Sequence, residues 1–325
     1  MKFRRRILIG LVLLILTALA GLCFGSARLS AEELLAAITG NGESSHWVIL
    51  RHVRLPRVAA GILAGIGLST AGALLQTVTS NALASPNIIG INSGAGLAVI
   101  LLLTFVPEAG AVLPLAAFLG AFGAALIILA IGGKMGSART YVLLMGIAVT
   151  TLFNAAISFL SLLDEGVLAQ YNHFTVGSLK GVSVEELGIP AVIIFSVFAA
   201  AMALAARLGV LAVGDEAASA LGIRVKRLRL LALACAAACS AAVVSFAGLL
   251  GFVGLVVPHM ARRLAGEQPG KLLPMSAVTG AILVVLADLL GRTLFAPSEL
   301  PVGILMSMVG APYFLILLCR RDAHA

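Results

Sequence analysis

Few residues in this chain could do chemistry, and a single carboxylate lies deep inside an apolar segment. Asp288 stands in a run of aliphatic residues, and Arg292 follows four positions later. An acid in lipid is costly and usually functional, as in proton relays. An arginine one helical turn away offers a simpler use, an intrahelical ion pair. We favour the ion pair, because a proton relay would need further ionisable partners at the same depth.

The residue patterns that carry catalysis or metal binding are missing. The nearest approach to a phosphate-binding loop, Gly132-Gly133-Lys134-Met135, lacks the first glycine and the hydroxyl residue of that motif. Cys235 and Cys239 have no histidine or acidic residue near them in the sequence, so we interpret them as packing residues. We therefore expect no enzyme and no cofactor site in this chain, and any energy for work must come from a partner.

One short polar segment, Gly214–Arg229, interrupts two long apolar runs and reads GDEAASALGIRVKRLR. Asp215 is suited to cap a helix, Glu216 follows in the first turn, and Gly222 stands where a C-terminal glycine belongs. The pattern predicts a helix of about two turns, too short to be stable alone. Held by membrane helices at the cytosolic surface, it would offer a partner this contact set: Asp215, Glu216, Ala217, Leu221 and Gly222.

Composition places the remainder of the chain in a membrane. The 325 residues are 61% hydrophobic and 11% charged, with a mean hydropathy of +1.11. Soluble domains carry about 25% charged residues. The apolar runs have helix length, so the predicted fold class is all-α, one polytopic membrane domain over residues 1–325. The net charge of +8 lies between apolar spans, which indicates topology and not nucleic-acid binding.

We expect about ten membrane spans, because a hydrocarbon core needs about 20 apolar residues per helix. The third is short, and a proline interrupts the eighth. The predicted spans are residues 7–25, 57–78, 93–106, 113–133, 141–162, 190–206, 230–248, 251–265, 275–295 and 302–319.

The distribution of lysine and arginine predicts that both termini are cytosolic. With the N-terminus inside, only six of the 22 basic residues fall outside, which is the usual positive-inside asymmetry. Two outer loops carry capping boxes, Ser30 with Glu33 and Ser183 with Glu186, and each predicts a short helix on the outer surface. The six outer residues are Arg28, Arg51, Arg54, Arg57, Lys180 and Arg292.

Small and polar residues inside the second span predict close helix packing. Gly61, Gly65 and Ser69 recur every four residues, a spacing typical of tight helix–helix contact. Gln76 is polar near the end of the same span, and either a helix–helix hydrogen bond or a place on a transport path fits it. Ser85-Pro86 reads as the start of the next helix.

Several strings in fixed order resemble the FecCD family of ABC transporter permeases, over nearly the whole chain. They are Leu55-Pro56-Arg57, Gly72-Ala73-Leu74-Leu75-Gln76, Asn81-Ala82-Leu83-Ala84-Ser85-Pro86, Ser93-Gly94-Ala95-Gly96, Gly251-Phe252-Val253-Gly254-Leu255-Val256-Val257-Pro258-His259, Glu299-Leu300-Pro301-Val302-Gly303 and Gly310-Ala311-Pro312.

The resemblance implies a permease subunit that moves an iron chelate (siderophore, haem or cobalamin) into the cytosol by alternating access. It implies a bacterial inner-membrane complex with a second permease chain, identical or different, and an extracytoplasmic substrate-binding protein. Two cytosolic ATPase subunits would bind ATP and Mg. The segment 215–222, between the sixth and seventh spans, would be the coupling helix that docks on an ATPase.

The resemblance also suggests roles for two further sets of residues. Arg54, Arg57 and Arg292 lie at the outer ends of their spans, and we favour docking to acidic residues of the binding protein over interfacial snorkelling. Asn81 and Leu83 follow the second span on the cytosolic side, where they form either a plain turn or, as the resemblance implies, part of the inner gate.

Two other function classes remain open from the residues alone. A secondary transporter driven by an ion gradient would need paired intramembrane charges or broken helices, and Asp288 is the only deep acid. A membrane scaffold would need no coupling helix. Co-purification with an ATPase that the binding protein stimulates would separate all three classes.

Overall fold

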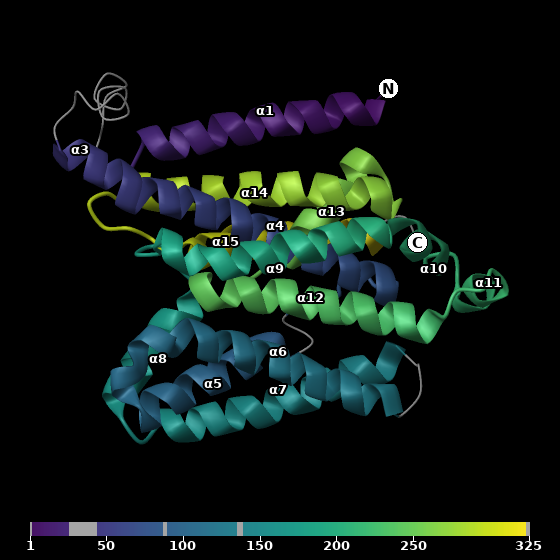
Figure 1. Ribbon diagram of the computed structural model, residues 1–325, viewed down its shortest axis with the longest axis horizontal. Helices are drawn as coiled ribbons and strands as arrows, with labels where there is room; N and C mark the ends of the chain where they lie inside the picture. The colour runs from purple at the N-terminus through teal and green to yellow at the C-terminus, as the bar shows by residue number, and fades with distance from the viewer. Residues whose placement is uncertain (1, 26–43, 87–89, 135–138, 323–325) are drawn as a thin grey trace.

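The computed structural model of the protein describes residues 2–25, 44–86, 90–134 and 139–322, and these form a helical bundle without strands (Figure 1). Short helices at the ends of the bundle connect the long ones. The helices are α1 (Lys2–Cys23), α3 (Ser44–Ile49), the π-helix η1 (Leu50–Arg54), α4 (Leu55–Thr79), α5 (Ile91–Phe105), the 3-10 helix η3 (Pro107–Val112), α6 (Leu113–Lys134), α7 (Arg139–Ser161), α8 (Glu165–Val176), α9 (Val184–Ala203), α10 (Ala205–Leu211), α11 (Asp215–Ala220), α12 (Val225–Ala247), α13 (Val253–Ala265), α14 (Pro269–Thr293) and α15 (Val302–Asp322).

Helix α4 is the centre of the bundle and packs against α9, α12, α13 and α14. Its glycines let neighbouring backbones come very close. A Cβ added at Gly65 would lie 2.3 Å from the carbonyl oxygen of Gly280, and one at Gly72 would lie 1.8 Å from that of Gly254. The predicted packing role of the small residues in this span is therefore confirmed.

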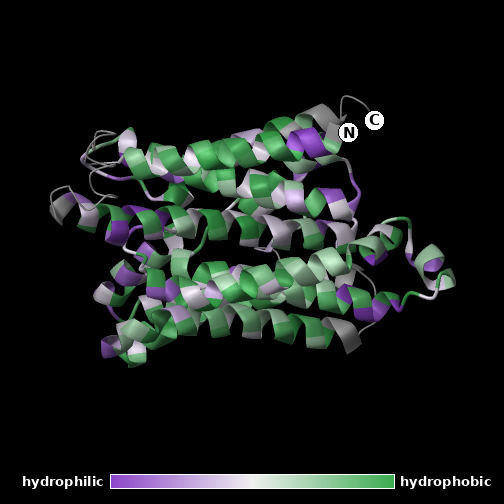
Figure 2. Ribbon diagram, turned by 45° about the horizontal axis from the view of Figure 1, so that its top comes forward, coloured by the Kyte–Doolittle hydropathy of each residue, from purple (hydrophilic) through white to green (hydrophobic). Residues whose placement is uncertain are grey.

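Seven stretches of helix are long and apolar enough to cross a membrane among the residues described. Apolar residues cover their middle parts, and polar ones gather toward the two ends of the bundle (Figure 2). Each of the ten segments expected to span is largely helical, but α5, α13 and the apolar part of α15 are shorter than the seven. The all-helical membrane fold is confirmed, whereas the count of about ten crossings stays a prediction.

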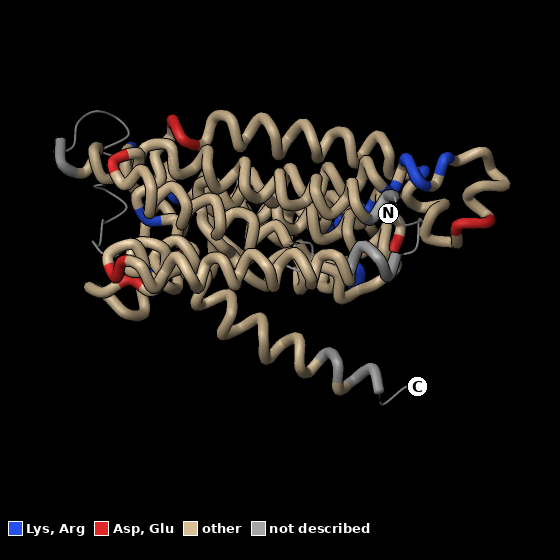
Figure 3. The backbone as a smooth tube through the Cα atoms, turned by 90° about the horizontal axis from the view of Figure 1, so that it is seen from below, with Lys and Arg blue, Asp and Glu red and all other residues tan. Residues whose placement is uncertain are grey.

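The two ends of the bundle differ in their charged residues and in the chain ends that they carry (Figures 1 and 3). Lysine and arginine gather at the pole that carries α11, together with a few acidic residues (Figure 3). The start of α1 and the end of α15 lie at this same pole (Figure 1). We call it the α11 end, and the other the opposite end. Chain ends on one side agree with an even number of crossings.

The outer capping boxes have different outcomes. Ser183 Oγ accepts from the Glu186 N–H at 3.3 Å, and Glu186 Oε2 accepts from the Ser183 N–H at 3.5 Å, so this box exists. It opens the long helix α9, however, and not a separate surface helix as expected. The apolar residues after the box continue in register, and Pro190 is accommodated within the helix. The other box, Ser30 with Glu33, lies outside the described residues.

Candidate functional site

Helix α11 projects from its end of the bundle, beyond the membrane-length helices (Figure 1). Gly222 has a φ of +77° and donates its N–H to Ser219 O at 2.9 Å, while the Ile223 N–H donates to Ala218 O at 3.0 Å. Paired bonds of this kind, around a left-handed glycine, end a helix and turn the chain away. The predicted position of the C-terminal glycine is confirmed.

The N-terminal cap of α11 differs from the prediction. Gly214 occupies the cap position, and no side chain bonds to the first turn. Asp215 is instead the first helical residue, and its carboxylate accepts from one Arg229 nitrogen at 2.9 and 3.0 Å. A charged guanidinium forms stronger hydrogen bonds to a carboxylate than a neutral backbone N–H does, which explains why the ion pair replaces the cap.

The expected ATPase-contact residues are mostly at the surface. Glu216, Ala217, Leu221 and Gly222 are exposed, and Leu221 is 70% exposed despite its apolar side chain. Ala218 is fully buried and holds α11 against the bundle. The helix thus presents one continuous face to solvent, with a carboxylate at its start and a leucine at its end.

Arg229 joins α11 to the central helix of the bundle. Its side chain is only 8% exposed. One end of the guanidinium binds Asp215, and Nε donates to the carbonyl oxygen of Val78 at 3.2 Å. Val78 belongs to the last turn of α4, where backbone carbonyls have no partner within the helix. A displacement of α11 would therefore move the last turn of α4 through the two bonds of Arg229.

The turn that follows α4 contains both residues expected at the inner gate. Ser80 adopts a left-handed conformation with φ +48° and ends the helix. The Leu83 N–H then donates to Asn81 Oδ1 at 2.9 Å, and the Ala84 N–H donates to Asn81 O at 3.1 Å. Asn81 and Leu83 are both half-buried. The structure brings them into one closed turn next to the carbonyl held by Arg229, and their role as a gate stays a prediction.

Gln76 is a helix–helix linker in this structure. Its side chain is buried, its Nε2 donates to Leu255 O at 3.2 Å, and its Oε1 accepts from Arg262 of α13. Of the two uses left open for Gln76, these contacts favour the hydrogen bond between helices.

The outer arginines lie together at the opposite end, and two of them bind the end of α1. Arg54 NH1 donates to Leu22 O at 2.5 Å and Cys23 O at 2.7 Å, and Arg292 NH2 donates to Gly21 O at 2.5 Å. These carbonyls belong to the last turn of α1, which is the negative pole of the helix dipole. Two guanidinium groups thus cap α1 from α14 and from η1.

Arg57 is the centre of a buried ion cluster that the sequence did not predict. Its Nε lies 2.9 Å from Asp288 Oδ1, and its NH1 lies 2.8 Å from Glu299 Oε2. The expected pair within α14 is present but longer, with Arg292 Nε 3.5 Å from Asp288 Oδ2. The predicted intrahelical pair of Asp288 is therefore confirmed, but the closest partner of its carboxylate, Arg57, comes from α4 and was not predicted.

The three arginines that were expected to dock to the binding protein are buried. Arg54, Arg57 and Arg292 are each at most 5% exposed and bind groups within the chain. In this conformation they hold α1, α4 and α14 together. Their contact with a binding protein stays a prediction, and it would require this cluster to rearrange.

Residues 13–320 match the model of the FecCD transport family. The chain belongs to the FecCD family. The described geometry is thus that of a membrane transport component, in agreement with the resemblance carried by the sequence strings.

Relatives of this FecCD chain cover nearly its whole length. It is 38% identical over 313 residues to the Fe(3+)-citrate import system permease protein YfmE of Bacillus subtilis, covering 96% of this chain and 94% of that protein. It is 35% identical over 330 residues to the hemin transport system permease protein HmuU of Yersinia pestis, covering 98% and 97%. The cobalamin import system permease protein BtuC of Halobacterium salinarum is 39% identical over 281 residues, covering 86% and 75%.

A solved structure of similar fold is described as an inward-facing conformation of a metal-chelate type ABC transporter. It matches this FecCD chain with a TM-score of 0.88 and 28% sequence identity, covering 98% of this chain and 99% of that one.

Sequence reasoning missed two residues of this FecCD chain that the structure makes prominent. The sequence shows Arg229 only as the last residue of the polar segment Gly214–Arg229, and Glu299 only as the first residue of a string shared with the family. Glu299 could have been found from the sequence. It follows the ninth predicted span on the outer side, and Arg57 opens the second predicted span on that same side. No sequence signal singled out Arg229 from Arg224, Lys226 and Arg227.

Proposed function

We propose that this FecCD-family chain is the permease subunit of an ATP-binding-cassette importer that carries an iron chelate into the cytosol. The relatives' names refer to Fe(3+)-citrate, hemin and cobalamin, which are all metals held in an organic ligand. A ferric siderophore is the leading substrate class, with haem and cobalamin as its alternatives. The chain has no nucleotide-binding motif, so ATP and Mg would bind to partner ATPase subunits.

The observation that carries this proposal is the exposed, capped helix α11 outside the membrane-length helices. A short helix with Leu221 exposed and Gly222 fixed in a left-handed conformation has no evident use in a scaffold. It is suited to fit a groove on another protein. We infer that one cytosolic ATPase subunit binds α11, and that the corresponding helix of a second permease chain binds a second ATPase subunit.

The polarity of the bundle supports a cytosolic position for α11. This end carries the basic cluster after α11 and both ends of the described chain (Figures 1 and 3). Under the positive-inside rule it would face the cytosol of a bacterial cell, with both termini inside. The opposite end would then receive the extracytoplasmic binding protein.

The contacts of Arg229 suggest how force from an ATPase reaches the substrate path. Movement of α11 would pull on Asp215, and through the Arg229 guanidinium on the carbonyl of Val78. Val78 is followed at once by the turn that holds Asn81 and Leu83. ATP binding by the partner would thus bias this turn between open and closed arrangements, as alternating access requires.

Coupling can be tested by placing the same backbone strain in and away from α11. Gly222 and Gly181 have φ values of +77° and +79°, and a Cβ at either would meet nothing within 4 Å. Gly222→Val should abolish the stimulation of ATPase activity by loaded binding protein in proteoliposomes, and also import. Gly181→Val, at the opposite end, should retain both. Both variants should insert into the membrane normally.

The proposal fails if Gly222→Val remains coupled, or if the purified chain moves its substrate without any ATPase. Testing ferric siderophore, haem and cobalamin separately in the same liposomes would identify the substrate. Stimulation by one of the three is the expected result.

A further inference from the structure

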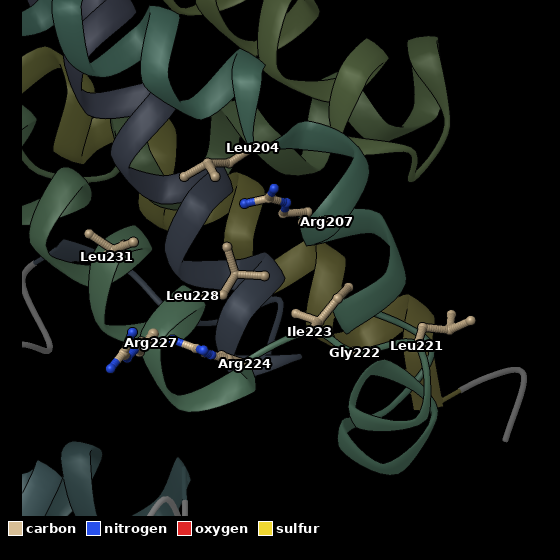
Figure 4. Close-up of a pocket in the computed structure, with 9 residues that line it drawn as sticks. All are labelled: Leu204, Arg207, Leu221, Gly222, Ile223, Arg224, Arg227, Leu228 and Leu231. Carbon is tan, nitrogen blue, oxygen red and sulfur yellow. The ribbon is translucent and has the colours of Figure 1, made fainter.

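A hollow of about 460 Å³ beside α11 has the composition of a phosphate-binding site with an apolar wall. Arg207 comes from α10, while Arg224 and Arg227 come from the start of α12, and Leu228 lies between the two groups (Figure 4). Leu204 and Leu231 complete the apolar side. No acidic residue lines this hollow.

The three arginines differ from the buried arginines described above. Arg207, Arg224 and Arg227 are exposed, and within the described part of the chain no carboxylate forms an ion pair with any of them. Three guanidinium groups around one hollow therefore create a local positive field that a neighbouring anion would neutralise. Arginine is well suited to phosphate because its planar donors bind two oxygens at once.

The level of the hollow along the bundle identifies the source of the anion. One membrane-length helix ends at Ala203, directly before Leu204, and the next begins at Val225, directly after Arg224. Leu231 lies inside that second span and is 55% exposed. The guanidinium groups thus stand at the level where a bilayer has its headgroups, and the leucine stands where it has acyl chains.

We propose that this hollow binds an anionic phospholipid, with the headgroup phosphate between the arginines and an acyl chain along Leu204 and Leu231. Basic pockets between membrane helices on the cytosolic side bind phospholipid headgroups of this kind. Leu221 and Gly222 form part of the same lining, so the lipid would brace the C-terminal end of α11. The site rests on the membrane placement of the chain and not on its transport activity.

Binding can be measured directly on the full chain in nanodiscs of phosphatidylcholine doped with cardiolipin or phosphatidylglycerol. Native mass spectrometry of the released protein reports which lipids stay bound, and a headgroup-labelled lipid reports affinity. The variant Arg207→Gln/Arg224→Gln/Arg227→Gln should bind anionic lipid at least about tenfold more weakly. The matched control Arg4→Gln/Arg5→Gln/Arg263→Gln removes the same charge from exposed arginines at the start of α1 and at the end of α13, which meet where Arg6 binds Leu264 O, and should change affinity less than about twofold.

The corresponding triple lysine variant should retain most of the binding, because lysine still offers a positive charge to phosphate. Equal losses in the glutamine variant and the control would overturn the proposal, since the effect would then be one of net charge. Displacement by inorganic phosphate at equal concentration would also overturn it, by showing a site for soluble anions. So would loss of the lipid from the assembled importer, which would assign the hollow to the ATPase interface. Each readout is lipid binding, so it can fail while transport remains.

Discussion

The buried cluster around Arg57 allows a prediction in which charge balance decides the outcome. A Cβ at Gly25 would lie 3.5 Å from one Arg292 nitrogen and 3.6 Å from one Arg54 nitrogen, so these two guanidinium groups are neighbours. Among the residues that the structure describes, they make with Arg57 three positive charges against the two negative charges of Asp288 and Glu299. Asp288→Asn keeps the shape of the side chain but doubles the net positive charge of the cluster, from one to two.

We expect Asp288→Asn to lower the free energy of unfolding by about 3–5 kcal/mol, the range for removing one partner of a buried ion pair. Asp288 is only 3% exposed, so water can compensate little. Glu299→Gln should have a smaller effect, about 1.5–3 kcal/mol, because that side chain is 16% exposed and makes one bond to Arg57. Titration of the detergent-purified chain with SDS, followed by circular dichroism, gives these values.

A double replacement separates charge balance from packing. Arg57→Met/Asp288→Leu removes one charge of each sign and leaves the net charge of the cluster at one. Apolar residues of similar size often replace a buried ion pair without loss, so the double variant should be more stable than Asp288→Asn. If Asp288→Asn costs less than about 1 kcal/mol, the cluster behaves like an exposed pair and the argument from burial is wrong.

Two further predictions concern helix contacts at other places in the bundle. Gly72→Val should destabilise the fold by more than the about 1–3 kcal/mol typical of overpacking, because its Cβ would lie 1.8 Å from Gly254 O. The measured result should be a lower yield of folded protein in the membrane. Gly123→Val, where nothing lies within 4 Å, is the control, and equal yields would refute the close approach. Arg229→Gln should leave ATP hydrolysis by the assembled importer intact but reduce import per ATP at least about tenfold, since it cuts the link between α11 and α4. Import per ATP equal to that of the unmodified chain would remove Arg229 from the coupling path.

The sequence was a good guide to the helices and to the C-terminal end of α11. Apolar runs of membrane length gave helices close to their predicted positions, because burial in lipid and helix formation both depend on local composition. Gly222 was predicted for a local reason as well, since a left-handed residue after a short polar helix is best made by glycine.

Contacts between distant segments could not be predicted in the same way. The sequence predicts the partner of Asp288 four residues away, and that pair is present, but the sequence gives no sign of the shorter bond to Arg57, 231 residues away. The cap at Asp215 failed for a similar reason, since Arg229 outcompetes the backbone only once α12 has folded against α11. Tertiary ion pairs overrule local patterns where burial makes them strong.

The separation in the chain between Arg57 and its partners has a consequence for biogenesis. The ribosome must add 231 more residues before Asp288 exists, and 242 before Glu299 does. At ~5–20 residues per second this is a delay of tens of seconds. Throughout that time the Arg57 guanidinium, near the start of α4, has neither of its carboxylate partners, so water or lipid headgroups must solvate it. The buried cluster can form only after α14 and the segment with Glu299 have been synthesised.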